Sequence, residues 1–540
     1  MKIKKTSNLI IYVFFLIYLT LGLFTLKDYG INIEEHTQLY SGIYWLNYIY
    51  DFFEINKSNE LINLLNQISR DTQLPNPAKY TYGPVYDVPI AFLEVWLNTQ
   101  DRSLSFEVRH FFIFIIFFIS TYFFFKILDK RFKNFFVSFF GLLLFIFSPR
   151  IYGDSFHNNK DIIFLSLVVI SIYFAFKIFE KKKIKNILLF SLFSALATST
   201  RIMGLFLPVS IILFIFLSDQ NKNIKKIRYY ILIVIFYFLF LILHWPFLWE
   251  APIENFLQYI KNSQEWIFSY YILYNGKYIL TTNLPDSYIF TWIGVTTPII
   301  NVILLLLGFC FVVNRLFLRF ILIDKVQSNY SDFWRSKNEM KDYFIFFNLT
   351  TILSTLLFLN VSLVSGWRHL YFLNIFIVYL AAYSLNIILL RLKSYKIKIL
   401  ILLTLIPNFM KIIEFHPYQS LYFNELLSDK RKNSFLIDRE GISRLDSINI
   451  ILDIDNKNEI NVANASFVPY YRISDVLNES DKKRINFVGT DYDKADYIYN
   501  NYVYEINPEY DDKYKIPKNF EMIYKLEIDG IIIYEIYKRI

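Results

Sequence analysis

Residues 9–36 read LIIYVFFLIYLTLGLFTLKDYGINIEEH, an apolar run followed by two adjacent carboxylates and a histidine. The apolar run has the length that a helix needs to cross a lipid bilayer. Basic residues precede it and no small-residue cleavage site follows, so we expect an uncleaved first span with its N-terminus inside. Glu34, Glu35 and His36 should therefore lie at the opposite membrane surface, at the mouth of whatever the other helices enclose.

The composition of the whole chain is that of a membrane protein. Of its 540 residues, 55% are hydrophobic and 20% aromatic, and nearly uncharged windows of about 20 residues recur along it. The net charge of +9 is carried by short basic tracts between these windows. This pattern indicates cytoplasmic loops rather than a nucleic-acid-binding face. The single cysteine, Cys310, rules out a disulfide framework within one chain.

The apolar segments predict about eleven transmembrane helices. The stretch 84–99 is short for a span and carries Asp87 and Glu94, so we expect it to lie in the membrane interface. With that choice every basic cluster falls inside, as the positive-inside rule requires. The predicted spans are 9–26, 111–128, 135–149, 162–179, 187–200, 203–218, 229–245, 288–313, 343–363, 370–390 and 399–413.

The predicted fold is an α-helical polytopic membrane protein with a small C-terminal α/β domain. The transmembrane domain takes residues 1–416, with interfacial helices in a first outer loop at 27–106 and a second large outer loop at 248–287. Within the second loop, 253–269 is amphipathic. From 417 to 540 the chain is more polar and its apolar runs have the length of strands, which predicts an extracytoplasmic domain. The expected strands are 449–452, 460–462, 485–488, 497–504, 520–528 and 531–537, the last two joined by an Asp529-Gly530 hairpin turn.

This threading places the titratable side chains at one face. All six histidines fall at outer ends or in outer loops: His36, His110, His157, His244, His369 and His416. Glu34, Glu35, Asp154, Asp161 and Arg368 fall there too. The concentration indicates a working face. The alternative is that interfacial loops are simply where polar residues are tolerated.

Several of these residues are candidates for chemistry. Partial desolvation at the membrane surface tends to raise a carboxylate pKa toward a range useful for a general base, so Glu34 and Glu35 are the catalytic candidates. Their alternative role is a solvated pair or a helix cap. In the loop 148–161, Arg150 or Lys160 could bind a phosphate and Asp154 or Asn158 a sugar, unless the loop is an Asx-rich turn.

Further binding candidates come from four other segments. Arg201 could clamp a lipid phosphate or could simply extend to the interface. Arg368 and His369 place two phosphate donors together. The segments that begin at His244 and at His416-Pro417-Tyr418 are rich in aromatic and donor groups. The binding candidates are Asp154, His157, Lys160, Asp161, Arg201, His244, Arg368, His369, His416 and Tyr418. No nucleotide-binding loop, dinucleotide fingerprint, Cys-x-x-Cys pair or serine-hydrolase elbow is found in the sequence.

At these residues the chain resembles the membrane glycosyltransferases of the GT-C fold, and in particular family 39, which includes protein O-mannosyltransferases and aminoarabinose transferases. The resemblance covers nearly the whole chain. It is carried by short motifs in a shared order: 30–35, 82–84, 148–161, 244–246, 283–285 with 296–298, 368–369, and 416–419 with 422–424. In that family the first outer loop carries an Asp-Glu pair whose Asp is the catalytic base. Here Glu34 stands at the Asp position and Glu35 at the Glu position.

The resemblance implies an enzyme that moves a sugar from a polyprenyl-phosphate donor to an acceptor on the extracytoplasmic face, with inversion at the anomeric carbon. The acceptor, whether glycan, lipid or protein, is left open. No cofactor is predicted, and dependence on a divalent metal stays open. Membrane lipids are expected partners and nucleic acid is not. The expected location is a bacterial inner membrane, with a cytoplasmic N-terminus and an extracytoplasmic C-terminal domain. The alternatives are a transporter or an inactive scaffolding protein of the same fold.

Overall fold

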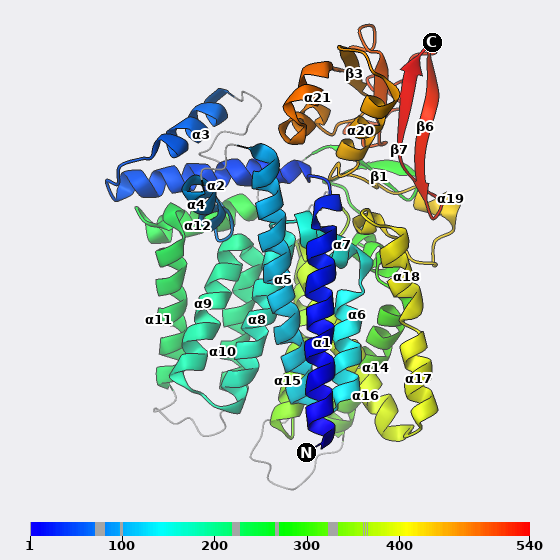
Figure 1. Ribbon diagram of the computed structural model, residues 1–540. Helices are drawn as coiled ribbons and strands as arrows, with labels where there is room; N and C mark the ends of the chain where they lie inside the picture. Colours follow the sequence, from blue (N-terminus) through cyan, green and yellow to red (C-terminus); the bar gives the residue numbers. More distant parts are fainter. Residues whose placement is uncertain are drawn as a thin grey trace.

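The computed structural model describes residues 2–70, 81–97, 101–218, 227–264, 269–321, 333–359, 361, 363 and 365–540. Most of these residues are helical (Figure 1). Long helices stand side by side in a bundle, and shorter ones lie across the end of it that faces the C-terminal domain. Three predicted features fall outside the described residues: Tyr80 in the first outer loop, and the basic segments at 222–226 and 322–332.

The upright helices form the membrane domain. They are α1 (Lys2–Thr25), α5 (Arg102–Phe132), α6 (Phe135–Ile146), α7 (Pro149–His157), α8 (Asp161–Glu180), α9 (Ile184–Thr200), α10 (Phe206–Ser218), α11 (Ile227–His244), α14 (Ile299–Ile321), α15 (Lys337–Phe358), α16 (Asn374–Arg391), α17 (Tyr395–Leu403) and α18 (Ile406–Glu414). In the described part of the chain, six helical segments are long and apolar enough to cross a membrane, and α6 with α7, bent by 62°, would make a seventh. The chain is therefore a multi-pass membrane protein, and the count of about eleven spans stays a prediction.

Two predicted spans are broken rather than continuous. The segment predicted at 288–313 divides into α13 (Tyr288–Thr296) and α14, with Pro298 between them. Proline has no backbone N–H to continue the helical hydrogen bonds, which accounts for the break. The segment predicted at 399–413 divides into α17 and α18 at Thr404 and Leu405, and a proline stands in the first turn of α18.

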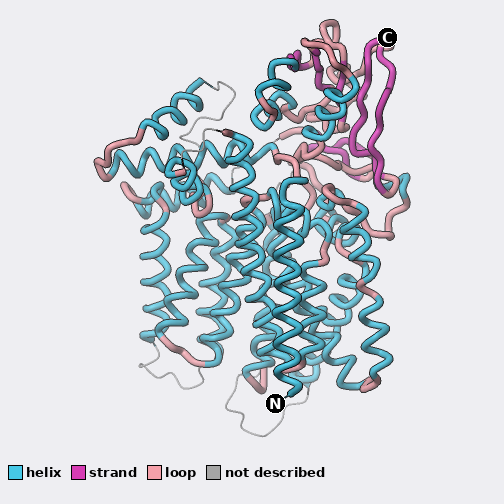
Figure 2. The backbone as a smooth tube through the Cα atoms, viewed as in Figure 1, coloured by secondary structure: helices cyan, strands magenta, loops and turns pink. Residues whose placement is uncertain are grey.

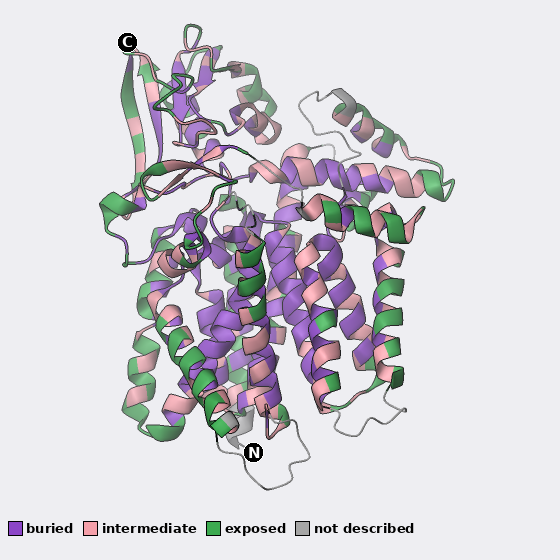
Figure 3. Ribbon diagram, turned by 180° about the vertical axis from the view of Figure 1, so that it is seen from behind, coloured by how far each residue is buried: buried purple, intermediate pink, exposed green. Residues whose placement is uncertain are grey.

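Burial separates the central helices of the bundle from the peripheral ones. In α8, 83% of the apolar window is buried, whereas α11 and α14 bury only 17% and 22% of theirs. Large apolar side chains are exposed along the peripheral helices, and Figure 3 shows exposed residues along the outside of the bundle. A helix that is apolar all round and exposed outside a bundle is one that faces lipid. The sequence 161–180 is thus the centre of the membrane domain.

A layer of helices lies across the end of the bundle. It contains α2 (Ile33–Phe52), α3 (Asn59–Arg70), α4 (Asp87–Trp96) and α12 (Pro252–Gln264), which lie across the upright helices (Figure 1). The ten residues of α4 make a helix about 15 Å long, half of what a crossing requires. This length agrees with the interfacial interpretation of 84–99, which stays a prediction, and α12 lies within the segment 253–269 that was predicted to be amphipathic.

The C-terminal residues form a domain at the end of the bundle opposite the N-terminus (Figure 1). Its five-stranded sheet has the order β4-β3-β5-β7-β6. The strands are β3 (Ile460–Asn464), β4 (Ile485–Gly489), β5 (Tyr497–Asn500), β6 (Phe520–Ile528) and β7 (Ile531–Arg539). Strand β3 pairs in parallel with β4 and β5, and β7 pairs antiparallel with β5 and β6. Asp529 and Gly530, with φ of 51° and 73°, make the predicted hairpin turn.

One predicted strand of this domain is wrong. Residues 449–452 lie within the helix α20 (Arg444–Ile454), where Ile448, Ile451 and Leu452 are buried. This spacing of three and four residues is the period of a helix face, and the short apolar run concealed it. The domain also contains the short helices α19 (Asp429–Lys432) and α21 (Glu479–Arg484).

A second, smaller sheet lies between this domain and the bundle. It is the hairpin of β1 (Tyr271–Tyr274) and β2 (Lys277–Leu280), turned at Asn275-Gly276. Its backbone bonds the C-terminal domain, with Tyr271 N donating to Glu505 O at 3.0 Å and Leu436 N to Leu273 O at 2.8 Å. Figure 2 shows that the strands gather at this end of the molecule. The second outer loop therefore helps to seat the domain on the bundle.

Candidate active site

The site begins with the cap of α2, which turns two neighbouring carboxylates in different directions. The Asn32 side chain accepts a hydrogen bond from Glu34 N (2.9 Å), and the Glu35 side chain accepts one from Asn32 N (2.8 Å). This reciprocal arrangement is a capping box. The Glu35 side chain is 1% exposed, whereas the Glu34 side chain is 39% exposed. Glu34 is thus the carboxylate left to face outward from the helix start.

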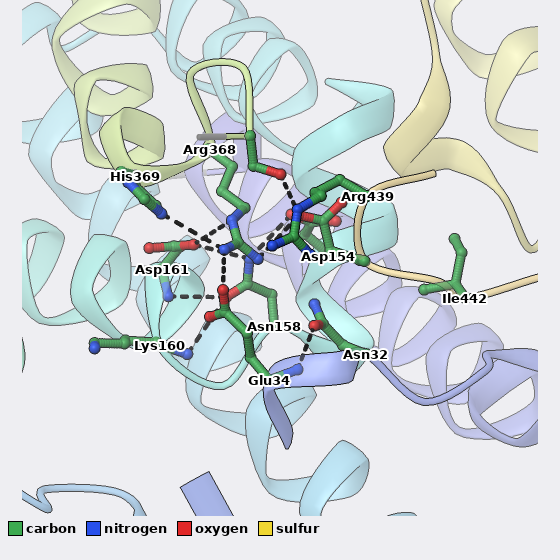
Figure 4. A network of polar contacts seen from close by, with 12 residues as sticks. Asn32, Glu34, Asp154, Asn158, Lys160, Asp161, Arg368, His369, Arg439 and Ile442 are labelled. Carbon is green, nitrogen blue, oxygen red and sulfur yellow. Dashed lines mark hydrogen bonds and ion pairs between the residues drawn. The ribbon is translucent and has the colours of Figure 1, made fainter. Parts of the chain in front are cut away.

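Three carboxylates, one of them Glu34, lie around the Arg368 guanidinium (Figure 4). Arg368 stands at the start of the 3₁₀ helix η6 (Arg368–Leu373) and is buried. Its Nη2 donates to Glu34, its Nη1 lies 3.0 Å from Glu440, and its Nε lies 3.6 Å from Asp161. The three acids come from α2, the C-terminal domain and the start of α8. One guanidinium therefore ties together three distant parts of the chain.

A second group of polar residues surrounds Asp161. Arg201, which follows the end of α9, donates to its carboxylate. Asn158 donates to Asp161 and to Asp154, each at 3.1 Å, and so holds these two acids at a fixed separation. Lys160 lies with its ammonium 3.1 Å from the centroid of the Tyr82 ring, a cation–π contact.

Two small clefts lie at this end of the bundle, each about 320 Å³ with the solvent at the mouth included, and Arg368 lines the second of them. The first, here the lysine cleft, is lined by Gln38, Ser41, Tyr82, Gly83, Tyr86, Asp87, Asn159, Lys160 and Thr200. The second, here the arginine cleft, lies under the C-terminal domain and includes Arg150, Asp154, Arg368, Arg439 and Glu440. In Figure 4, Lys160 and His369 lie on one side of Arg368, and Asp154 and Arg439 on the other.

The site shifts the pKa of several groups outside the spans. Burial tends to raise the pKa of Glu34, but the Arg368 charge, helped by His369, outweighs this and holds it well below the ordinary value. Burial and the nearby Arg201 lower the pKa of Lys160 to about 7. Burial raises the pKa of Asp87 to about 7. At neutral pH Glu34 is ionised, while Lys160 and Asp87 are poised to titrate.

Glu35 is built into the support of the site. Besides capping α2, it lies 3.0 Å from Nε2 of His110 on α5. The preceding residue of α5, Arg109, forms a two-pronged ion pair with Glu94 of α4, both distances being 2.8 Å. These buried contacts fix α2, α4 and α5 against one another. Of the two predicted catalytic residues, Glu34 is therefore the partly exposed partner of Arg368, which lines the arginine cleft, whereas Glu35 is held among buried partners.

His157 and His369 lie in the same region as the carboxylates. His157 is fully buried 3.7 Å from Asp154, and neither ring nitrogen has a hydrogen-bond partner in the described residues. Nε2 of His369 lies 3.5 Å from Nη2 of Arg368. The structure therefore brings seven predicted binding residues into the region around Arg368 and Asp161. These are Asp154, His157, Lys160, Asp161, Arg201, Arg368 and His369.

The remaining three predicted binding residues have other contacts. His244, at the end of α11, meets the Ser199 hydroxyl of α9 at 2.7 Å. His416 lies 2.8 Å from Asp28, and Tyr418 donates to Asp446 of the C-terminal domain at 3.0 Å. These contacts join helices or domains to one another. The structure does not place these side chains in the network of described residues around Arg368.

The sequence analysis did not find the contribution of the C-terminal domain. Glu440 and Arg439 lie in the loop 438–444, which it treated as part of a separate domain. The only local signal is Gly441, which has φ of 67° and marks a turn. Asp87 and Tyr82 were noticed in the first outer loop but were not assigned to a site. In the described residues no group of three or more His, Cys, Asp or Glu side chains is arranged to hold a metal ion.

Comparison with known proteins gives a match to a protein family. The family described as dolichyl-phosphate-mannose-protein mannosyltransferase matches residues 96–246. The matched segment runs from the end of α4 to the end of α11, and it carries Arg150, Asp161 and Arg201 of the site described above. None of the curated proteins compared with the chain matches it. The family match confirms the resemblance to the GT-C membrane glycosyltransferases that the sequence motifs indicated.

Proposed function

We propose that the protein transfers a sugar from a polyprenyl-phosphate donor to an acceptor hydroxyl, with inversion, at the membrane face where the C-terminal domain sits. The observation that supports this best is the placement of Glu34. It is an ionised, partly accessible carboxylate paired with Arg368, and Arg368 lines one of two clefts at this face. A two-substrate displacement needs a base at the meeting point of a donor site and an acceptor site.

The proposed reaction is a single displacement at the anomeric carbon of the donor sugar. The acceptor hydroxyl gives its proton to the Glu34 carboxylate, and its oxygen forms a bond with the anomeric carbon. The bond from that carbon to the phosphate oxygen breaks on the opposite face, and the polyprenyl phosphate leaves with the electron pair. The pairing with Arg368 makes Glu34 a weak base in the free enzyme, because it lowers the Glu34 pKa. A bound phosphate that shares the Arg368 charge would raise the proton affinity of Glu34.

The lysine cleft is the better candidate for the donor phosphate. Lys160 lines it, and Arg201 lies beside it next to Thr200. The adjoining α10 and α11 expose apolar side chains on the outside of the bundle, where a polyprenyl chain can lie in the lipid. A cationic pair at the point of bond cleavage stabilises the charge that develops on the leaving phosphate. The acceptor would then approach from the arginine cleft.

A transporter is the chief alternative. Transporters usually bind their substrate near the bilayer midplane at broken helices. Here the charged residues of the site gather where the bundle meets the C-terminal domain, because Arg368 pairs with Glu440 of that domain. This position favours a reaction at the membrane surface over passage through the bilayer.

Purified protein in vesicles with a radiolabelled polyprenyl-phosphate sugar tests the proposal. Transfer of label to an extracted membrane or glycan acceptor, lost in Glu34→Gln, supports it. Accumulation of label inside the vesicles without transfer would establish transport instead. Donor binding with neither transfer nor uptake, in the presence of a complete cell-envelope extract as acceptor, would leave a binding or scaffolding role.

A further inference from the structure

The arginine cleft contains a buried arginine without a carboxylate partner. Arg150, in the first turn of α7, is only 9% exposed. Its Nε donates to the Tyr422 carbonyl at 2.7 Å, and its guanidinium lies 4.8 Å from the Phe423 ring and 5.3 Å from the Trp292 ring. It also meets the Tyr371 hydroxyl. Among the described residues, no carboxylate oxygen lies within 4 Å of it, and a buried cation without a counter-ion is costly.

A second arginine in the cleft, Arg439, also lacks a carboxylate partner among the described residues. Arg439 comes from the loop 438–444 of the C-terminal domain and lines the cleft with Arg150. Its guanidinium lies over Tyr270 at 5.5 Å and Phe467 at 5.2 Å, and it reaches the Tyr270 hydroxyl at 3.4 Å. In the described part of the chain it also has no carboxylate oxygen within 4 Å. Aromatic rings hold both guanidiniums in place without neutralising them.

The two acids that line the cleft already have partners. Asp154 accepts a hydrogen bond from Asn158, and Glu440 is bound by Arg368 and by the Ser365 hydroxyl at 2.6 Å. The cleft therefore offers two oriented guanidinium groups that form no ion pair within 4 Å among the described residues, although the Asp154 and Glu440 carboxylates lie close enough to act on the Arg150 charge. Guanidinium groups favour oxyanions such as phosphate and carboxylate, which can accept two hydrogen bonds from one arginine.

We propose that the arginine cleft is an oxyanion subsite for the acceptor, which therefore carries a phosphate or carboxylate close to the hydroxyl that is glycosylated. This proposal rests on the proposed function in one respect, the assignment of the ligand as the acceptor. Arg150 from the membrane domain and Arg439 from the C-terminal domain bind the oxyanion together. The C-terminal domain is then part of the acceptor site, and it selects acidic acceptors over neutral ones.

Binding to the full chain in nanodiscs of zwitterionic lipid tests the proposal without requiring turnover. The probes are glucose 6-phosphate, glucuronate and glucose, titrated calorimetrically against loaded and empty nanodiscs. Glucose 6-phosphate, glucuronate or both should bind at least tenfold more tightly than glucose, and the preference identifies the group. Arg439→Gln should weaken that binding about tenfold, the usual size for one lost charge-assisted hydrogen bond. Arg150→Lys, which keeps the charge but not the planar fork, should weaken it less.

Matched variants separate this site from the donor site. The control is Arg431→Gln. Arg431 belongs to the same domain, its side chain donates to that of Asn275 at 3.0 Å, and it does not line the arginine cleft, so this variant should bind the acidic probes normally. Lys160→Gln should weaken binding of polyprenyl phosphate and leave the acidic sugars unaffected. If Arg439→Gln weakens polyprenyl phosphate as much as glucose 6-phosphate, the arginine cleft holds the donor phosphate and the proposal is wrong.

Probe binding and sugar transfer, measured on the same protein, distinguish failure of the acceptor subsite from failure of the proposed function. A wild-type protein that transfers sugar but binds neither acidic probe more tightly than glucose overturns the acceptor subsite alone. A protein that binds an acidic probe through Arg439 but transfers no sugar keeps the oxyanion site and removes its assignment to a glycosyl acceptor. Normal probe binding by both Arg439→Gln and Arg150→Lys would place the oxyanion elsewhere.

Discussion

At the scale of single residues, the capping box of α2 assigns different roles to two adjacent glutamates. Both carboxylate oxygens of Glu35 form hydrogen bonds with buried partners, Asn32 N and His110. Glu34 keeps a partly exposed carboxylate beside Arg368. The difference follows from position in the helix, because the third residue of a capping box must turn back toward the cap and its neighbour need not.

The first prediction compares these two glutamates. Glu34→Gln should lower the transfer rate about 10²–10⁴-fold with donor binding retained, because an amide cannot accept the proton. Glu35→Gln should affect the thermal unfolding temperature more than Glu34→Gln does, since it weakens a buried contact with His110. Transfer kinetics and thermal unfolding of the two variants check this.

Glu34→Asp is the matched control for the first prediction. It restores the residue usual in family 39 and should keep part of the activity. Normal transfer by Glu34→Gln together with an inactive, stably folded Glu35→Gln would assign the base to Glu35.

The second prediction concerns the pH dependence of donor binding. Lys160 is neutral above its pKa of about 7, so its attraction for the donor phosphate should fade as the pH rises through that value. A sugar phosphodiester keeps its single negative charge throughout, so the change belongs to the protein. Lys160→Arg, which stays protonated, should bind the donor equally well at pH 6 and pH 8.

Asp87 is the competing explanation for that pH dependence. Its pKa is also about 7, and its ionisation adds a negative charge to the same cleft. Asp87→Asn should leave the pH dependence largely in place. If Asp87→Asn abolishes it and Lys160→Arg does not, the titrating group is Asp87.

The residues of the site were predictable from sequence only where they belong to short motifs at outer helix ends. Glu34, Asp161, Arg201 and Arg368 were found because a charge beside an apolar span is unusual. Glu440 could not be found, because nothing in residues 438–444 marks a contact with Arg368. His244 and Tyr418 look equally polar in the sequence, and only the fold gives them packing partners.

At the scale of elements, the loop 438–444 is pressed against the start of α2. Ile33 N donates to the Glu440 carbonyl at 2.9 Å, and the buried Arg444 donates to the Ile31 carbonyl at 2.7 Å. A Cβ added at Gly30 would stand 2.2 Å from the Ile442 carbonyl oxygen. The absence of a side chain at Gly30 therefore allows the loop that carries Arg439 and Glu440 to reach the site.

The third prediction tests this contact. Gly30→Ala should displace the loop, lower stability by about 1–3 kcal/mol and reduce transfer, because Glu440 and Arg439 move away from the clefts. Gly294→Ala is the matched control, since a Cβ there meets nothing within 4 Å and the residue lies within the helix α13. Thermal unfolding and transfer assays of both variants check it. Equal behaviour of the two variants would show that the contact at Gly30 is not tight.

Helices and strands were predicted well where the spacing of apolar residues matches one of the two periods clearly. They were predicted poorly where the apolar segment is too short to distinguish a helix from a strand. The hairpin of β6 and β7 was found because Asp529-Gly530 suits both left-handed turn positions. Residues 449–452 were assigned to a strand because a run of three apolar residues after Asn449 is too short to distinguish the period of a strand from that of a helix. The breaks near Pro298 and Pro407 show that hydropathy detects an apolar segment but not its continuity.

At the scale of the whole molecule, the two ends of the bundle carry different sets of charged residues. The end under the C-terminal domain holds the carboxylates and arginines of the site. At the other end, Asp342 binds Arg131 at 2.6 Å and Arg315 at 3.0 Å, which joins the starts or ends of α15, α5 and α14. Hydropathy and charge alone predicted this separation, since both depend on composition. Hydropathy and charge could not predict that Glu34, Asp161 and Glu440 meet at Arg368.

The last prediction concerns the orientation of the chain in the membrane. The N-terminus and the C-terminal domain lie at opposite ends of the bundle, and the basic tract at 181–185 lies between α8 and α9, at the end remote from Asp161. If the basic tracts are cytoplasmic, the site and the C-terminal domain face outward. With Cys310 replaced by alanine, single cysteines at the exposed positions Asn56, Asn275 and Asn478 should react with an impermeant thiol reagent in intact cells, whereas cysteines at Lys183 and Lys393 should react only after the cells are opened. The labelling also tests the proposed reaction, because a polyprenyl-phosphate sugar can reach Glu34 only from the side on which Asn478 reacts. Labelling of Lys183 in intact cells, with Asn478 protected, would invert the bundle and place the site on the cytoplasmic face.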